Sequence, residues 1–320
     1  MIYIKNAGSF EKLKDWEILV KRVNFQQEVD LSSKKLLDAF GFYELSAKQP
    51  CGIKSCRKQH YKGVLVITED GIETNIGHNC GFRIFGVKFE NLATELTKRV
   101  NYYKTLTAVK EAKSKVWEYW QLAAKFQVGE RNLQWVAHNF MDIKDISIIG
   151  RSAYQNIMRL AGSGNGKVTI SRRKTAEESD MEDVMSDKDH SHLQPLDNET
   201  DKNKKPQYKQ VVIGTIQHCE SVLSDYDVAL IYERDVKNVL NALDECNPDS
   251  MHQNKLTSLH IKVSKLDERI RFIEERIKKA QVFLTQTNLA PLYAKIESQR
   301  NVSKKDKELF SAFLLTLPEV

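Results

Sequence analysis

The fold of the N-terminal part is decided by the stretch Cys51-Gly-Ile-Lys-Ser-Cys56-Arg-Lys-Gln-His60, which a second stretch, Gly77-His78-Asn-Cys80-Gly81, completes. Three cysteines and two histidines therefore fall within 30 residues. In a chain with an odd number of cysteines, such clustering indicates a metal site rather than disulfide bonds. Zinc prefers four sulfur or nitrogen ligands at tetrahedral corners. We expect a closed, structural zinc site formed by Cys51, Cys56, His60 and Cys80, with His78 as the alternative fourth ligand.

The residues between these two stretches have the pattern of a β-hairpin. Two runs rich in β-branched residues, 63–68 and 72–76, flank the turn Glu69-Asp-Gly71. An Asp-Gly pair between such runs is a strong hairpin signal. A hairpin here returns the chain so that Cys80 arrives beside the loop of Cys51 and Cys56.

The order of loop, hairpin, ligand and helix over residues 51–95 resembles the treble-clef or zinc-ribbon-like type of zinc finger. In that superfamily the fourth ligand usually comes from the first turn of the helix. Here His60 is favoured over His78, because His78 and Cys80 are only two residues apart on what can still be strand. The superfamily includes nucleic-acid binders, protein binders and a few nucleases, so the resemblance implies an architecture rather than one function.

The rest of the chain predicts a mainly α protein of the α+β class. A strand over 1–8 precedes two expected helices, one from Ser9 to Val23 and one from Ser32 to Phe40. Apolar residues in steps of three and four predict a long helix over 89–127 and shorter helices over 130–141 and 151–161. We expect five segments, namely an N-terminal strand and helices (1–44), the zinc-binding hairpin finger (45–88), a long helix and short helices (89–162), a second hairpin (163–216) and a helical coiled-coil region (217–320).

The second hairpin is predicted from two β-rich stretches, 167–173 and 208–216, that flank an acidic stretch. Residues 175–201 contain ten acidic residues and one basic residue, whereas the whole chain has a net charge of +6. The remaining residues therefore carry a net charge of +15, which favours association with polyanions. So polar a segment cannot bury enough apolar surface to offset its ordering entropy, so we expect a disordered acidic loop over 174–206.

The C-terminal third is predicted to be helical, with a helix over 217–245 and a final helix after Ser303. Between them, residues 256–284 repeat apolar side chains in alternating steps of three and four, which is typical of a coiled-coil seam. The simplest interpretation is packing within one chain against the 217–245 or the 89–127 helix. The alternative is a homodimer formed through the 256–284 helix.

Basic residues surround the predicted finger, with Tyr61, Phe82 and Phe85 among them. Proteins that bind single strands use cations interleaved with aromatic rings. The alternative is a solvated face over a small core that buries Phe82 and Phe85. The candidate nucleic-acid-binding residues are Arg57, Lys58, Lys62, Arg83 and Lys88 at the finger, and Arg172 and Arg173 beside the acidic stretch.

We predict a non-enzymatic binding or regulatory protein that contacts nucleic acid or a nucleic-acid-processing complex. No catalytic residues are predicted, because the sequence has no nucleophile elbow, kinase motif or dinucleotide fingerprint. One alternative is a protein–protein interaction module or inhibitor, of the kind that a phage or other mobile element encodes, which uses its helices and acidic loop. A second alternative is a metal-dependent nuclease with His60 or His78 as base.

The remaining features concern location. The sequence has no run of about 18 apolar residues and no signal-peptide pattern at its N-terminus, which predicts a cytoplasmic protein without a membrane partner.

Cys219 and Cys246 lie on predicted helices away from other metal-ligating residues. We therefore expect them to be ordinary core thiols.

Overall fold

The computed structural model describes residues 1–175, 177–178 and 208–320, and most of the predicted acidic loop lies outside them. The described residues form two compact units. Unit 1 comprises residues 1–116 and 242–264, and unit 2 comprises residues 117–241 and 265–320. Each unit therefore joins segments that are distant in the sequence. With an antiparallel sheet, long helices and a second hairpin, the predicted α+β class is confirmed.

The helices and strands follow one another in this order: β1 (Ile2–Asn6), β2 (Ser9–Leu13), α1 (Trp16–Val20), β3 (Leu36–Pro50), β4 (Gln59–Thr68), β5 (Glu73–Ile76), α2 (His78–Ser114), α3 (Val116–Ala124), η1 (Lys125–Gln127), α4 (Leu133–Lys144), α5 (Ile146–Ile149), α6 (Arg151–Ser163), β6 (Lys167–Arg173), β7 (Tyr208–Thr215), η2 (Cys219–Val222), η3 (Ser224–Tyr226), α8 (Val228–Tyr232), the π-helical η4 (Glu233–Lys237), α9 (Asn238–Glu245), η5 (Pro248–Ser250), α10 (Gln253–Val263), α11 (Leu266–Phe283), α12 (Gln286–Ser298) and α13 (Lys304–Thr316).

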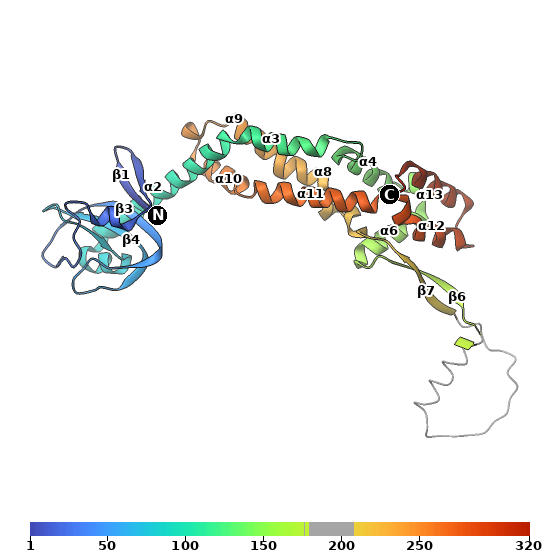
Figure 1. Ribbon diagram of the computed structural model, residues 1–320, viewed down its shortest axis with the longest axis horizontal. Helices are drawn as coiled ribbons and strands as arrows, with labels where there is room; N and C mark the ends of the chain where they lie inside the picture. Colours follow the sequence, from blue (N-terminus) through green and yellow to red (C-terminus); the bar gives the residue numbers. More distant parts are fainter. Residues whose placement is uncertain (176, 179–207) are drawn as a thin grey trace, which may run out of the picture. The chain divides into compact units, whose positions relative to one another are not determined.

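Unit 1 is built on an antiparallel sheet with strand order β2-β1-β3-β4-β5 (Figure 1). Successive side chains of a strand point to opposite faces, so both faces can be buried. In β4, Val64 and Val66 join the core that contains Phe89 and Leu96 of α2. Leu65 joins the core on the other side, which contains Leu19 of α1. Helix α2 therefore covers one face of the sheet, and α1 covers the other.

The predicted hairpin at Glu69-Asp-Gly71 is confirmed. Strands β4 and β5 pair antiparallel from Ile67 and Glu73 to Val64 and Ile76, and Gly71 has a φ of 83° in the turn. The left-handed conformation at this glycine suits a tight turn. The hairpin is not isolated, because β4 also pairs with β3 and so joins the larger sheet.

Both helices predicted before residue 44 are wrong over most or all of their length. Ser9 begins strand β2, which pairs with β1 across a two-residue turn in which Ala7 and Gly8 have positive φ. Only Trp16–Val20 of the first predicted helix is helical. The second predicted helix is the start of β3, whose pairing with both β1 and β4 overrides the helical spacing of Leu36 and Phe40. Strand pairing with distant segments is the stabilising interaction that the local pattern does not contain.

The long helix predicted over 89–127 begins earlier and has two interruptions. Helix α2 starts at His78, and Gly86 breaks its regular geometry with φ 59° and ψ −145°. It ends at Ser114, and α3 continues to Ala124. Inside unit 1, α10 packs along α2 and buries Leu256, Leu259 and Val263. Every helix in the described part of the chain is too short or too polar to cross a membrane.

Unit 2 consists of helices with one hairpin. The predicted hairpin of 167–173 and 208–216 is confirmed as β6 and β7, which pair from Lys167 and Thr215 to Arg173 and Tyr208. Figure 1 shows it extending away from the helices. The base of the hairpin packs closely against α12. A Cβ atom added to Gly214 would lie only 2.5 Å from the Pro291 ring, so this close packing requires a glycine. The predicted helix 217–245 starts only at Val228, after the turns η2 and η3.

The apolar stripe of residues 256–284 is buried within the single chain. It is divided between α10 and α11, with the break at Ser264 and Lys265. Helix α10 packs on α2 in unit 1, and α11 packs on α8, η4 and α4 in unit 2. Each half of the stripe therefore packs against other helices of the same chain, as the simpler of the two interpretations expects. The buried stripe residues are Leu256, Leu259, Val263, Leu266, Ile270, Ile273, Ile277, Ala280 and Leu284.

Candidate metal centre

The first two cysteines lie on a tight loop that connects β3 to β4. The Cys51 amide donates to the carbonyl oxygen of Lys58 at 2.8 Å, and the Cys56 amide donates to that of Ile53 at 3.0 Å. Arg57 has a φ of 51°, so the chain reverses there in the left-handed region. These bonds hold Cys51 and Cys56 on one closed loop of the backbone.

The third cysteine comes from the first turn of α2. The Sγ atoms of Cys56 and Cys80 are 3.1 Å apart, and the sulfurs of Cys51, Cys56 and Cys80 all lie within 4.8 Å of one another. All three are free thiols. Sulfurs about 2.3 Å from a tetrahedral metal would lie about 3.8 Å apart, so small movements suffice to bind one. Three of the predicted ligands are therefore brought together, and they can hold a metal ion.

The three thiols lie close together in partly buried surroundings, which changes their pKa values. Burial raises the pKa of Cys51, and burial together with the hydrogen bond to Cys56 raises that of Cys80 to about 12. Burial also acts to raise the pKa of Cys56, but hydrogen bonds from the Lys58 amide and from the other two cysteines lower it on balance. A divalent cation among the sulfurs would reverse the penalty on the thiolates, since its charge favours the ionised form.

His60, on β4, has one ring nitrogen bound and one without a partner. Its Nδ1 lies 2.7 Å from the Tyr43 hydroxyl. Its Nε2 is buried and has no hydrogen-bond partner among the described residues. Burial lowers the pKa of His60, which favours the neutral imidazole that ligates metals. An unpartnered buried nitrogen is costly unless something else binds it.

Gly77 links His60 to the cysteine cluster. A side chain on Gly77 would lie 3.3 Å from the Nε2 atom of His60, and the Gly77 amide is a hydrogen-bond donor to the Cys51 thiol. The set of mutually close ligand atoms nevertheless contains the three sulfurs and includes neither His60 nor His78. Of the two histidines, His78 is exposed at the start of α2 and its ring packs against Phe89 at a centroid distance of 5.7 Å.

Two residues of this site were not found from the sequence, Tyr43 and Asn75. The Asn75 amide donates to the Tyr43 hydroxyl at 3.1 Å and to the Pro50 carbonyl oxygen at 2.9 Å. The amide thereby ties β5 to the end of β3, one residue before Cys51. No sequence signal could have found this pair, because Tyr43 reaches His60 only through the pairing of β3 with β4 across an irregular stretch between Glu44 and Gln49.

The basic residues predicted at the finger are exposed around the cysteine loop, but two of them have structural contacts. Arg57 forms an ion pair with Glu28 at 3.3 Å, and the Lys88 ammonium donates to the Leu36 carbonyl oxygen. Phe82 is 48% exposed, whereas Phe85 packs against the core. We call the following exposed residues around the cysteine loop the finger surface: Lys54, Arg57, Lys58, Tyr61, Lys62, Phe82 and Arg83.

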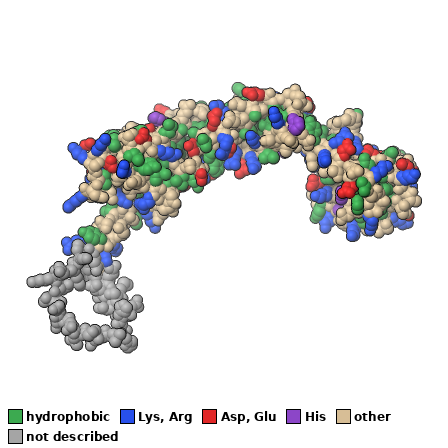
Figure 2. Space-filling model, turned by 180° about the vertical axis from the view of Figure 1, so that it is seen from behind, with side chains coloured by type: hydrophobic (Ala, Val, Ile, Leu, Met, Phe, Trp, Pro, Cys, Tyr) green, Lys and Arg blue, Asp and Glu red, His purple; other side chains and the backbone are tan. Residues whose placement is uncertain are grey.

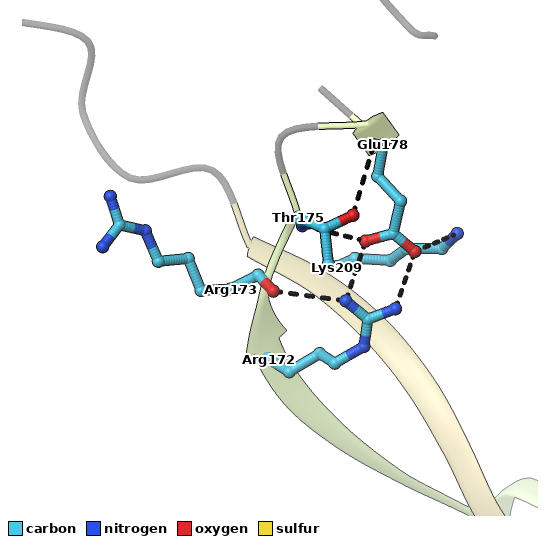
Figure 3. Close-up of polar contacts among 5 residues, drawn as sticks. All are labelled: Arg172, Arg173, Thr175, Glu178 and Lys209. Atoms are coloured by element: carbon cyan, nitrogen blue, oxygen red, sulfur yellow. Dashed lines mark hydrogen bonds and ion pairs between the residues drawn. The ribbon is translucent and has the colours of Figure 1, made fainter. Parts of the chain in front are cut away.

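Arg172 and Arg173 lie at the outer end of β6, far along the chain from the finger surface. Figure 3 shows the two terminal guanidinium nitrogens of Arg172 donating to the two carboxylate oxygens of Glu178, at 2.7 and 2.6 Å, while the Arg173 side chain points away. Lys209 of β7 lies 3.5 Å from the same carboxylate. Figure 2 shows Lys and Arg side chains gathered at this end of the hairpin. The Glu178 carboxylate, at the described start of the acidic stretch, is therefore neutralised by the bases beside it.

Comparison of the chain with protein-family models, curated proteins and solved structures finds no match. The chemistry of the site itself must therefore carry the functional argument. The site consists of three thiols on a loop and a helix N-terminus, beside the half-buried His60.

Proposed function

We propose that the chain is a non-catalytic, zinc-stabilised protein that binds nucleic acid through the finger surface. The metal holds the cysteine loop against the start of α2. Both segments carry exposed cations and aromatic rings, so the metal fixes the binding surface without taking part in a reaction. In this proposal, the cysteine loop, the hairpin and the start of α2 form a zinc finger that resembles the treble-clef type.

Zinc is the proposed ion because three thiolates and an imidazole form a closed tetrahedral set for it. The unpartnered Nε2 atom of His60 supports this histidine as the fourth ligand. In that role Tyr43 accepts a hydrogen bond from the Nδ1–H of His60, as acceptors behind metal-bound histidines commonly do. A nuclease that uses His60 as base is disfavoured, because the buried Nε2 cannot reach a water molecule on a bound phosphodiester.

The observation that carries the proposal is the composition of the finger surface. Residues 51–62 contain four basic residues and no acidic residue. The ring of Tyr61 is half exposed, and the Lys48 ammonium lies 5.3 Å above its centroid. Phe82, next to Arg83, exposes its ring from the first turns of α2. Exposed rings among exposed cations match the stacking and phosphate contacts by which proteins bind single strands.

The proposal is tested by measuring the affinity of the metal-loaded chain for labelled single-stranded and duplex DNA and RNA over a range of salt concentrations. We expect affinity to fall steeply with salt, since Lys and Arg release counterions from phosphates. Lys58→Ala, Lys62→Ala and Arg83→Ala should each reduce the salt slope by about 0.7 to 0.9 if each cation contacts one phosphate.

Lys35→Ala is the matched control, because this exposed lysine lies in unit 1 outside the finger surface. It should leave the affinity nearly unchanged. Absence of binding at low salt would overturn the proposal and leave a protein partner as the ligand of the finger surface. Equal effects of Lys35→Ala and Lys62→Ala would show binding by net charge alone.

A further inference from the structure

A second basic and aromatic site lies in unit 1, along the side of α2 that faces the β1–β2 turn. It is a groove of about 660 Å³ between this turn, α2 and α10. Pockets of about 300–1,000 Å³ typically hold small ligands. Gly8 and Ser9 form one wall, and Asp249 and Gln253 contribute from the segment around α10.

The α2 wall has a regular composition. Its lining residues recur four positions apart, which places them on one side of the helix. Cations stand at both ends of the row and two tyrosines stand between them. In chain order these residues are Lys98, Arg99, Tyr102, Tyr103, Leu106, Thr107 and Lys110.

The cations of this groove are only partly neutralised. Lys110 pairs with Asp249 at 2.6 Å. The exposed side chains of Lys98 and Arg99 have no hydrogen bond or ion pair with any residue that the structure describes. Among the described residues, the groove therefore keeps two unopposed positive charges, at the end of its α2 row that is nearer to the finger in the sequence.

The two tyrosines of the groove differ in their surroundings. Tyr103 is fixed by ring contacts with Phe10 and Tyr3, at centroid distances of 5.5 and 6.3 Å. Tyr102 is half-buried and makes no ring contact within the described residues. A planar group that enters the groove can therefore stack on Tyr102, one helical turn from Lys98 and Arg99.

We infer that this groove binds a segment of single-stranded nucleic acid, with a base on Tyr102 and the adjoining phosphates on Lys98 and Arg99. The inference rests on the proposed function and adds a second contact outside the finger surface. A single strand is favoured over a duplex because a half-buried ring can stack only on a base that is free to leave its neighbours.

The test uses the metal-loaded full chain and a fluorescein-labelled oligothymidylate, with fluorescence anisotropy as the readout. Tyr102→Leu should weaken binding by about 5- to 160-fold, because stacking on an aromatic ring is worth about 1–3 kcal/mol per base. Tyr102→Phe, which keeps the ring, should bind nearly as the unmodified chain does. Lys98→Ala and Arg99→Ala should each reduce the salt slope by about 0.7.

Lys14→Ala is the matched control for charge, because Lys14 is exposed in unit 1 and does not line the groove. Circular dichroism and metal content identify any variant that fails to fold. An oligonucleotide that carries iodouracil should cross-link to Tyr102 under ultraviolet light.

The outcomes separate this inference from the proposed function. If the oligothymidylate binds but the groove variants behave as Lys14→Ala does, with cross-links only at Tyr61 or Phe82, the groove inference is wrong and the proposed function stands. If no nucleic acid binds, both fail. Equally tight binding of duplex DNA or polyglutamate at the groove would overturn base stacking there.

Discussion

His60 holds one ring nitrogen against the Tyr43 hydroxyl and leaves the other buried without a partner among the described residues. In a folded protein, such an atom either costs the free energy of its desolvation or binds a ligand such as a metal ion. The neighbouring sulfurs of Cys51, Cys56 and Cys80 give the second interpretation its chemistry. Single substitutions at this histidine and at its hydrogen-bond partner therefore test the proposed coordination directly.

We expect His60→Ala to weaken zinc binding strongly and Tyr43→Phe to weaken it by about 10- to 100-fold, the usual cost of removing a hydrogen-bond partner behind a ligand. Competition with a chromophoric chelator measures both affinities. His78→Ala is the control, because the exposed His78 ring packs on Phe89 outside the cluster of sulfurs. A loss of affinity in His78→Ala with none in His60→Ala would assign the fourth position to His78 instead.

At the scale of elements, the hairpin of β6 and β7 carries a charge contact whose pH dependence can be derived. Hydrogen bonds from Arg172 and from the Thr175 amide lower the pKa of Glu178 to about 2, from an ordinary value of 4.5. Because the pKa of Glu178 is lower in the folded chain than in the unfolded chain, the contact stabilises the hairpin fully at pH values above the ordinary pKa of 4.5. That stabilisation is lost as the pH falls toward about 2.

We therefore predict that the Glu178 carboxylate, followed by NMR, titrates near pH 2, and that Arg172→Gln moves its pKa back toward 4.5. Arg173→Gln is the matched control, because the Arg173 side chain points away from the carboxylate (Figure 3). An unchanged titration in Arg172→Gln would mean that the contact does not persist in solution.

Helix α11 provides a second prediction at this scale, about where its apolar stripe is buried. Ile273 is completely buried within the chain. Ile273→Ala should lower the free energy of unfolding of unit 2 by about 2–5 kcal/mol, the usual cost of a core cavity. Val282→Ala on the same helix should cost little, because Val282 is 41% exposed.

Denaturant unfolding at several protein concentrations distinguishes this packing from a coiled-coil dimer. Burial within one chain gives a midpoint that does not depend on protein concentration. A dimer held together by the stripe gives a midpoint that rises with concentration, since association favours the folded state by mass action. A midpoint that rises with protein concentration in the unmodified chain but not in Ile273→Ala would support the homodimer.

Elements whose signal is local in the sequence can be found from the sequence alone. The turn at Asp70 and Gly71, the hairpin of β6 and β7 and the stripe of α11 were predicted because each has its signal within a short window. Cys219 and Cys246 were predicted to be core thiols because they lie away from other metal-ligating residues in the sequence, and both are buried.

The elements that were missed depend on partners far away in the chain. The spacing of Phe10, Leu13 and Trp16 is helical, yet β2 forms because β1 lies next to it and a turn through Ala7 allows the two to pair. Such a turn lacks the Asn-Gly or Asp-Gly pair that usually marks it. The predicted hairpin was enough to bring the three sulfurs together. The contact of Tyr43 with His60 depends on the register between β3 and β4, which the sequence does not reveal.

At the scale of the whole molecule, the chain passes between its two units three times, so neither unit is one continuous segment. The cysteine cluster belongs wholly to unit 1, which also contains Trp16 as its single tryptophan. The Trp16 ring packs on Tyr43 at a centroid distance of 5.0 Å, and Tyr43 contacts His60. Trp16 therefore reports on the surroundings of the metal site, whereas Trp117, Trp120 and Trp135 report on unit 2.

We predict that removing zinc with a chelator moves the Trp16 unfolding transition to lower denaturant and leaves the transition of unit 2 in place. Ligand binding to the folded state alone stabilises it by about 2.7 kcal/mol at a hundred times the dissociation constant, and chelation removes that contribution from unit 1 only. Cys80→Ser should reproduce the shift without chelator, and Cys246→Ser should not, because Cys246 is a buried thiol outside the cluster. Trp16→Phe identifies the signal of unit 1. If both transitions move together, the metal stabilises the whole chain; if neither moves, the three cysteines are core thiols and the proposed zinc site is wrong.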